Sequence, residues 1–207
     1  MKTGLAKIFT TSFLLILLIV SGCNNIKEKS YALEESGENQ LLKDIESIAK
    51  ELEEKTINQF KSQSDEYNIQ GKIIKTSLKG KDIINFEVIL DEPKSELSDL
   101  TVTFVLSKDL IHYLHANHFF TSNLFSTSNL APDGEEKGLG VSKSLALLPD
   151  DHVLRYEEFD KETFKSLIGQ IKVKTSWKDA NGIDHSEYIF LEGEYISIDN
   201  NIYEMFE

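Results

Sequence analysis

The sequence predicts a mainly β protein, in which an antiparallel β-sandwich follows an N-terminal amphipathic helix and contains short inserted helices. Short runs of alternating apolar and polar residues recur after residue 66, and turn-forming residues separate them. No rhythm of strands alternating with long helices appears, which argues against a parallel sheet. A single stretch before residue 66 instead has apolar residues at helical spacing.

The expected helix covers residues 40–62. Its apolar residues recur three and four positions apart, and its other face carries Lys, Glu and Asp. The apolar residues are Leu41, Leu42, Ile45, Ile48, Ala49, Leu52, Ile57 and Phe60. Such a helix either packs on the domain or pairs with a helix of a partner. We favour packing, because the apolar stripe is short for a coiled coil.

Six or seven short strands are expected in the sandwich domain, residues 66–207. They cover residues 69–78, 84–90, 100–106, 140–148, 171–177 and 186–191, with a last edge strand at 195–198. Short helices are expected at 108–116 and 157–168, and a long irregular loop at 118–138. The Asn181-Gly182 pair marks a hairpin. The pattern favours an immunoglobulin-like sandwich, although the Cys–Trp–Cys hallmark of true immunoglobulin domains is missing.

The composition narrows the choice of partners. The chain has 207 residues and a formal net charge of −13. An acidic surface repels phosphate backbones, so nucleic acid is not an expected partner. Arg155 is the only arginine and Cys23 the only cysteine. Sites built on arginine clusters, internal disulfides and multi-cysteine zinc sites are therefore excluded.

The first 23 residues have the features of an export signal. A segment with two lysines and no acidic residue precedes an apolar stretch over residues 8–20. The sequence Val20-Ser21-Gly22-Cys23 then follows. This segment resembles the lipobox of bacterial lipoproteins. The alternative interpretation is an ordinary secretory signal or an uncleaved anchor helix.

The lipobox resemblance implies cleavage between Gly22 and Cys23 and lipid on the Cys23 thiol. Residues 1–22 would be removed, and residues 23–39, which are polar, would form a flexible tether. The protein would then be lipid-anchored at the outer face of the cell membrane. The remaining chain would have 20 basic and 35 acidic residues, because the leader carries two lysines and no acid. The lysine-rich, arginine-poor composition is typical of Gram-positive bacteria of low GC content.

Three histidines, His112, His115 and His118, form one candidate site. His112 and His115 would lie one turn apart on the predicted helix 108–116, with His118 just beyond it. Imidazoles so placed are plausible zinc or copper ligands, although no HExxH motif accompanies them. The alternative is three solvated or packing histidines, and no cofactor is expected. Asp179, Asn181 and Asp184 faintly resemble a calcium loop, but a hairpin turn explains them equally well.

Aromatic residues around the predicted loop form a second candidate site. Phe119, Phe120 and Phe125 would make an apolar binding patch if exposed, and would plug one end of the sandwich if buried. No motif of a catalytic nucleophile or of phosphate binding stands out, so an enzyme is not expected. The sequence therefore predicts a non-enzymatic binding module of the cell envelope, with a protein, peptide or envelope polymer as its partner. The alternative is a metal-binding surface lipoprotein that uses the three histidines.

Overall fold

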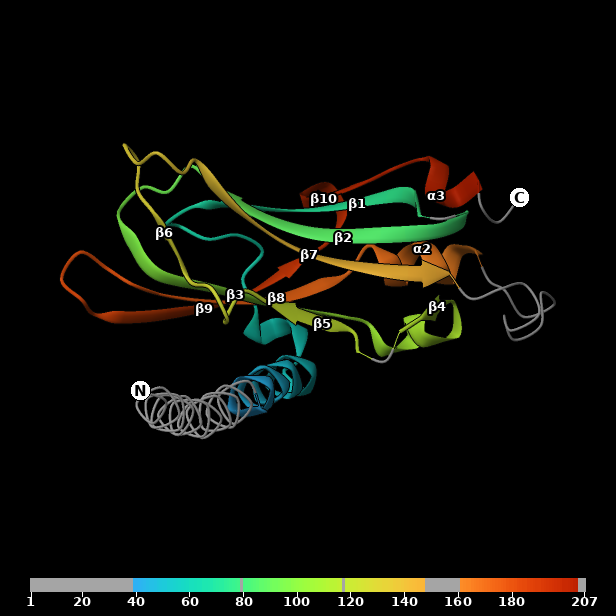
Figure 1. Ribbon diagram of the computed structural model, residues 1–207, viewed down its shortest axis with the longest axis horizontal. Coiled ribbons are helices and arrows are strands. Elements are labelled where there is room, and N and C mark those ends of the chain that lie inside the picture. Colours follow the sequence, from blue (N-terminus) through green and yellow to red (C-terminus); the bar gives the residue numbers. More distant parts are fainter. Residues whose placement is uncertain (1–38, 79, 117, 148–160, 205–207) are drawn as a thin grey trace, which may run out of the picture. The chain divides into compact units, whose positions relative to one another are not determined.

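The computed structural model describes residues 39–78, 80–116, 118–147 and 161–204. Residues from Ile45 onward form one compact unit. This part of the chain is mainly β, with two sheets arranged as layers (Figure 1). The predicted leader, the lipidation site at Cys23 and nearly all of the tether lie outside the described residues.

Sheet 1 has five strands. They are β1 (Asn68–Leu78), β2 (Lys81–Asp91), β4 (Leu114–His115), β7 (Gly138–Leu147) and β10 (Ile196–Ile198). Their order across the sheet is β10-β1-β2-β7-β4. All neighbours are antiparallel except β10, which runs parallel to β1. The expectation of a wholly antiparallel fold is therefore wrong at this edge, because the chain crosses over from sheet 2 before adding β10.

Sheet 2 also has five strands. They are β3 (Leu97–Leu106), β5 (Phe120–Ser122), β6 (Ser128–Leu130), β8 (Ile171–Lys178) and β9 (Asp184–Leu191). Their order is β5-β3-β8-β9, and β6 pairs with the other end of β3. All these pairs are antiparallel.

The core lies between the inner faces of the two sheets. Phe86 of β2 and Phe104 of β3 are fully buried in a single cluster with residues of β8 and β9. Strand β8 shows why the core lies on one face of the sheet. Buried residues alternate with half-buried ones along its whole length, because neighbouring residues of a strand point to opposite faces. The inner residues of β8 are Ile171, Val173, Thr175 and Trp177, and the outer ones are Lys172, Lys174, Ser176 and Lys178.

The helices are short apart from the first. A helix covers residues 39–54, and α2 covers Lys161–Ile168 within the predicted 157–168 segment, of which residues 157–160 are not described. The other helical segments of the described residues are the 3-10 segments η1 (Ile57–Gln59), η2 (Lys108–His112) and η4 (Gly193–Tyr195) and the short helix α3 (Asn201–Glu204).

The first helix ends at residue 54, rather than at 62 as predicted. Thr56 starts a new turn, in which its N–H donates to the Gln59 side chain over 2.9 Å. The chain then runs extended, and Lys61 pairs with Ile189 on the outer edge of β9. Ile57 is therefore 59% exposed, although its spacing matched the helical stripe. Tertiary pairing of the backbone overrides the local helical pattern here.

The segment after β3 also differs from the prediction. Ser107 caps a turn as expected, accepting a hydrogen bond from the Asp109 N–H, but the turn is the single 3-10 turn η2. Leu114 and His115 then form β4 and pair with β7, so the predicted helix 108–116 is wrong. The predicted loop 118–138 contains β5 and β6. Asn123 holds the chain between them against β3, accepting from the Val102 N–H and donating to the Leu100 carbonyl.

Candidate functional site

The helix segment from Ile45 to residue 54 packs on the outer face of sheet 2. Ala49 and Leu52 are buried against Val105 of β3, with Phe120 and Tyr188 at the margins of this small cluster. Outer-face residues of a two-layer β fold are normally solvated. This helix segment therefore turns part of the outer face of sheet 2 into a second, minor core.

A lysine of the sheet terminates the helix. The Lys172 ammonium donates to the backbone carbonyls of Leu52 over 3.0 Å, of Glu53 over 3.3 Å and of Lys55 over 2.9 Å. Carbonyls in the last turn of a helix have no partner within the helix, and a cation there also complements the helix dipole. Burial lowers the pKa of Lys172. The three carbonyls thus match the three donors of the ammonium group of Lys172, which is half-buried beside the groove.

Glu51 makes a second polar contact between helix and sheet. Its carboxylate accepts from Lys174 over 2.8 Å and from the Tyr188 hydroxyl. The Lys55 ammonium lies 4.0 Å from the centre of the Tyr188 ring, a cation–π distance. Partial burial raises the pKa of Glu51, but the hydrogen bonds from Lys174 and Tyr188 and the nearby positive charges outweigh it, so that its pKa is lowered overall.

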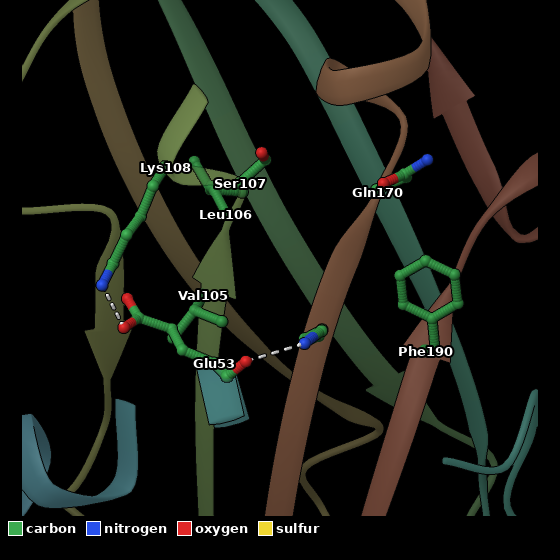
Figure 2. Close-up of a pocket in the computed structure, with 8 residues that line it drawn as sticks. Glu53, Val105, Leu106, Ser107, Lys108, Gln170 and Phe190 are labelled. Atoms are coloured by element: carbon green, nitrogen blue, oxygen red, sulfur yellow. Dashed lines mark hydrogen bonds and ion pairs between the residues drawn. The ribbon is translucent and has the colours of Figure 1, made fainter. Parts of the chain in front are cut away.

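A groove of about 230 Å³ opens beside the end of this helix, toward the start of β8 (Figure 2). Figure 2 shows the ion pair of Lys108 with Glu53 on one side of the groove and the Phe190 ring on the other. The groove is lined by Glu53, Val105, Leu106, Ser107, Lys108, Gln170, Lys172 and Phe190.

The charged groups that line the groove already have partners. Lys108 and Glu53 are 2.5 Å apart, and the Lys172 ammonium is held by the helix carbonyls. Val105, Leu106 and Phe190 supply the apolar part of the lining, and each is itself almost buried. Pockets for whole small ligands typically have volumes of roughly 300–1,000 Å³. The size and lining of the groove therefore suit an apolar side chain of a larger partner better than a free small molecule.

The sequence predictions missed every residue of this groove. One signal was present: Phe104-Val105-Leu106 and Ile189-Phe190-Leu191 are consecutive apolar runs at strand ends. Strictly alternating strands have one solvated face, whereas consecutive apolar residues indicate that both faces are covered. These runs lie where the helix packs on the outer face of sheet 2 and where the groove opens beside it.

A second, shallower depression lies on the outer face of sheet 2, toward the end of β8 and the start of β9. Its volume is about 370 Å³. It is lined by Asp99, Lys174, Ser176, Trp177, Lys178, Asp184, His185 and Ser186. Lys178 pairs with Asp99 over 2.8 Å, and Lys174 pairs with Glu51 of the helix. The helix segment thus separates an apolar groove from a polar depression.

The three predicted aromatic residues do not form one patch. Phe119 is buried in the main core, and Phe120 packs beside the minor core under the helix. Phe125 is 55% exposed in the turn between β5 and β6. Phe119 directly precedes β5, Phe120 begins it, and Phe125 lies beyond it, so the three side chains have different surroundings.

The three histidines are not on one helix. His112 ends the turn η2, His115 belongs to strand β4, and His118 follows the strand. The geometric reason for grouping His112 with His115 is therefore wrong, since a strand does not have helical spacing. His118 is exposed and its ring lies 5.2 Å from that of Phe120. The side chains of His112 and His115 lie outside the described part, so the metal site stays a prediction.

The segment around Asn181-Gly182 is a hairpin turn between β8 and β9, as its sequence predicts. Asp179 accepts hydrogen bonds from the N–H groups of Asn181 and Ile183, and its second oxygen lies 3.1 Å from His185 Nε2. Gly182 has φ of +76°, which favours glycine. The backbone hydrogen bond from Ile183, with His185, lowers the pKa of Asp179. The carboxylate therefore stabilises the turn itself.

The fold and the groove define a two-sheet, mainly β protein with an open surface site on one sheet. Neither a protein-family model nor a curated protein matches this chain. Within the described residues, no helix combines the length and the apolar character that crossing a membrane requires. No group of three or more potential metal ligands occurs among those residues either.

The contacts of Glu51 predict a pH-dependent contribution to stability. Since its pKa is lower in the folded state, Glu51 stabilises the fold above its unfolded pKa of about 4.3, and this stabilisation is lost as the pH falls through the folded pKa. We expect Glu51→Gln to lower the free energy of unfolding by about 0.2–1 kcal/mol at pH 7, the range for exposed pairs. Urea unfolding at pH 7 and pH 3 measures the difference.

The matched control is Glu54→Gln. Glu54 lies 3.8 Å from Lys50 on the exposed side of the same helix and does not touch the sheet. Its substitution should change stability less at pH 7. A Glu51→Gln deficit as large at pH 3 as at pH 7 would contradict the assignment.

Proposed function

We propose that this protein is a lipid-anchored extracytoplasmic lipoprotein that binds a polypeptide of the cell envelope without catalysing a reaction. The groove beside the docked helix carries the binding part of this proposal. Its floor is apolar, and its charged groups are already paired. Such a site can bury an apolar side chain without leaving a buried charge unpaired.

The anchoring part rests on the leader. The apolar stretch over residues 8–20 and the sequence Val20-Ser21-Gly22-Cys23 support lipid attachment at Cys23. More than one acyl chain would give stable anchoring at the outer face of the cell membrane. The strong acidic excess would repel anionic lipid head groups, so that residues 23–39 hold the domain away from the bilayer.

We further propose that the fold is an immunoglobulin-like sandwich. The order β1-β2-β7-β4 corresponds to strands A-B-E-D, and β3-β8-β9 corresponds to C-F-G. Strand β5 takes the place of the additional strand beside C. Two departures are the parallel strand β10 outside β1 and the position of β4 before β5 in the chain. This fold hosts many unrelated functions, so the binding proposal depends on the groove.

Lipid attachment is tested by metabolic labelling with radioactive palmitate. The parent protein should incorporate the label, and Cys23→Ser should not, because Cys23 carries the only thiol of the chain. Ser21→Ala is the matched control: alanine is also small, so processing and labelling should persist. A Cys23→Ser protein that still labels would contradict the anchor.

Occupancy of the groove is tested by photo-crosslinking in intact cells. A photoreactive residue at Gln170, which lines the groove, should yield a polypeptide adduct of defined mass. The same residue at Gln70, exposed on β1 of sheet 1, is the control and should yield none. Adding Phe190→Ala, which removes part of the apolar floor, should reduce the adduct at position 170 by about tenfold, the equivalent of 1.4 kcal/mol. Equal yields at positions 170 and 70 would contradict the proposal.

A further inference from the structure

The outer edge of β9 is paired along only part of its length. The Lys61 N–H donates to the Tyr188 carbonyl over 2.9 Å, and the Phe190 N–H donates to the Lys61 carbonyl over 2.9 Å. This single bridge covers the end of β9 that lies under the helix. Nearer the hairpin, no described residue pairs with this edge, since β9 has β8 as its only neighbouring strand.

The bridge shows which backbone groups point outward. Along any β-strand, the N–H and C=O of one residue point to one side, and those of the next residue point to the other. Tyr188 and Phe190 direct these groups toward Lys61. The alternate residues Ser186 and Asp184 must therefore direct theirs to the same outer edge, where both residues are exposed. An open edge of this kind is a template for an added strand.

The polar depression adjoins this edge, and three of its side chains can accept a hydrogen bond and have no partner. Its lysines are both held by carboxylates, Lys174 by Glu51 and Lys178 by Asp99. Among the described residues, the Asp184 carboxylate and the hydroxyls of Ser176 and Ser186 make no hydrogen bond or ion pair. Ser176 and Ser186 lie opposite each other across β8 and β9, so their side chains share the outer face with Asp184. The free acceptors are two hydroxyls and one carboxylate, whose charge also acts on Lys178.

We infer that the β9 edge from Asp184 to Ser186 binds an extended peptide as an added strand, with a Lys or Arg side chain of the peptide seated on Asp184, Ser176 and Ser186. Backbone hydrogen bonds to the edge supply affinity, and the depression selects the side chain. A cationic donor suits a site whose free groups are acceptors, in a chain with a net charge of −13. This site is separate from the apolar groove, and the two can be tested independently.

The test uses the full-length lipoprotein in detergent micelles and a fluorescent ten-residue peptide of alternating Lys and Val. Fluorescence polarisation should show saturable binding, and a peptide of alternating Glu and Val should bind at least tenfold more weakly. N-methylation distinguishes strand addition from simple charge attraction. Methylating either all Lys or all Val amides blocks the amides on one side of the peptide. One of these two peptides should lose binding at least tenfold, while the other retains it.

The protein variants test the position of the site. Asp184→Lys should weaken binding of the Lys-Val peptide at least tenfold. Glu204→Lys changes the net charge equally on the exposed surface of α3, which contacts β1 of sheet 1, and should change binding less than twofold. Gln170→Trp, which fills the apolar groove, should leave binding of this peptide unchanged. A failure of the groove proposal would therefore not count against the edge site.

Three results would overturn the inference. The first is no saturable binding of either peptide. The second is equal binding of the two N-methylated peptides, because a strand added to an edge uses the amides of one side only. The third is an equal effect of Asp184→Lys and Glu204→Lys, which would indicate attraction by the overall charge of the protein.

Discussion

The attachment of the helix segment from Ile45 to residue 54 to the outer face of sheet 2 shapes both candidate binding sites of this protein. The attachment combines a small apolar contact, Ala49 and Leu52 on Val105, with the Lys172 ammonium beneath the last helical carbonyls. The apolar contact is small, since it involves three buried residues. An isolated helix of this length is only marginally stable in water, so we expect the helix to need both contacts to stay folded on the sheet. The half-buried Lys172 ammonium in turn takes its three hydrogen-bond acceptors from the end of the helix.

The helix divides the outer face of sheet 2 into an apolar part and a polar part. On its groove side, Val105 and Phe190 line an apolar groove, and the nearby charges are paired with each other or with the helix. On its other side, Glu51 and Asp99 neutralise the lysines of β8 and leave acceptor groups free. The ligands that we propose for them are an apolar side chain for the groove and a basic, extended peptide segment for the depression. Both are groups that a polypeptide can supply, so the two proposals concern the same class of partner.

The sequence predicted the long strands well, because each has one buried and one solvated face and therefore a period of two. It missed β4, β5 and β6, since two or three residues are too few to show a period. It also extended the helix to residue 62, because Ile57 and Phe60 fit the helical spacing while the backbone of Lys61 pairs with β9. The groove depends on Lys172 meeting Leu52, 120 positions away in the sequence. Local patterns do not contain such pairings, although the consecutive apolar residues around Val105 and Phe190 indicated a covered outer face.

The most direct test of this account is amide hydrogen exchange of Lys172→Met, compared with Lys94→Met, a substitution at an exposed loop residue. Removing the ammonium should release the helix end, because a hydrogen bond to a charged group contributes roughly 1.5–3 kcal/mol. We expect the amides of Ala49 and Leu52 to exchange at least tenfold faster in Lys172→Met, with β2 and β8 unchanged. Unchanged protection at Ala49 and Leu52, or equal loss in both variants, would contradict the central role of this contact.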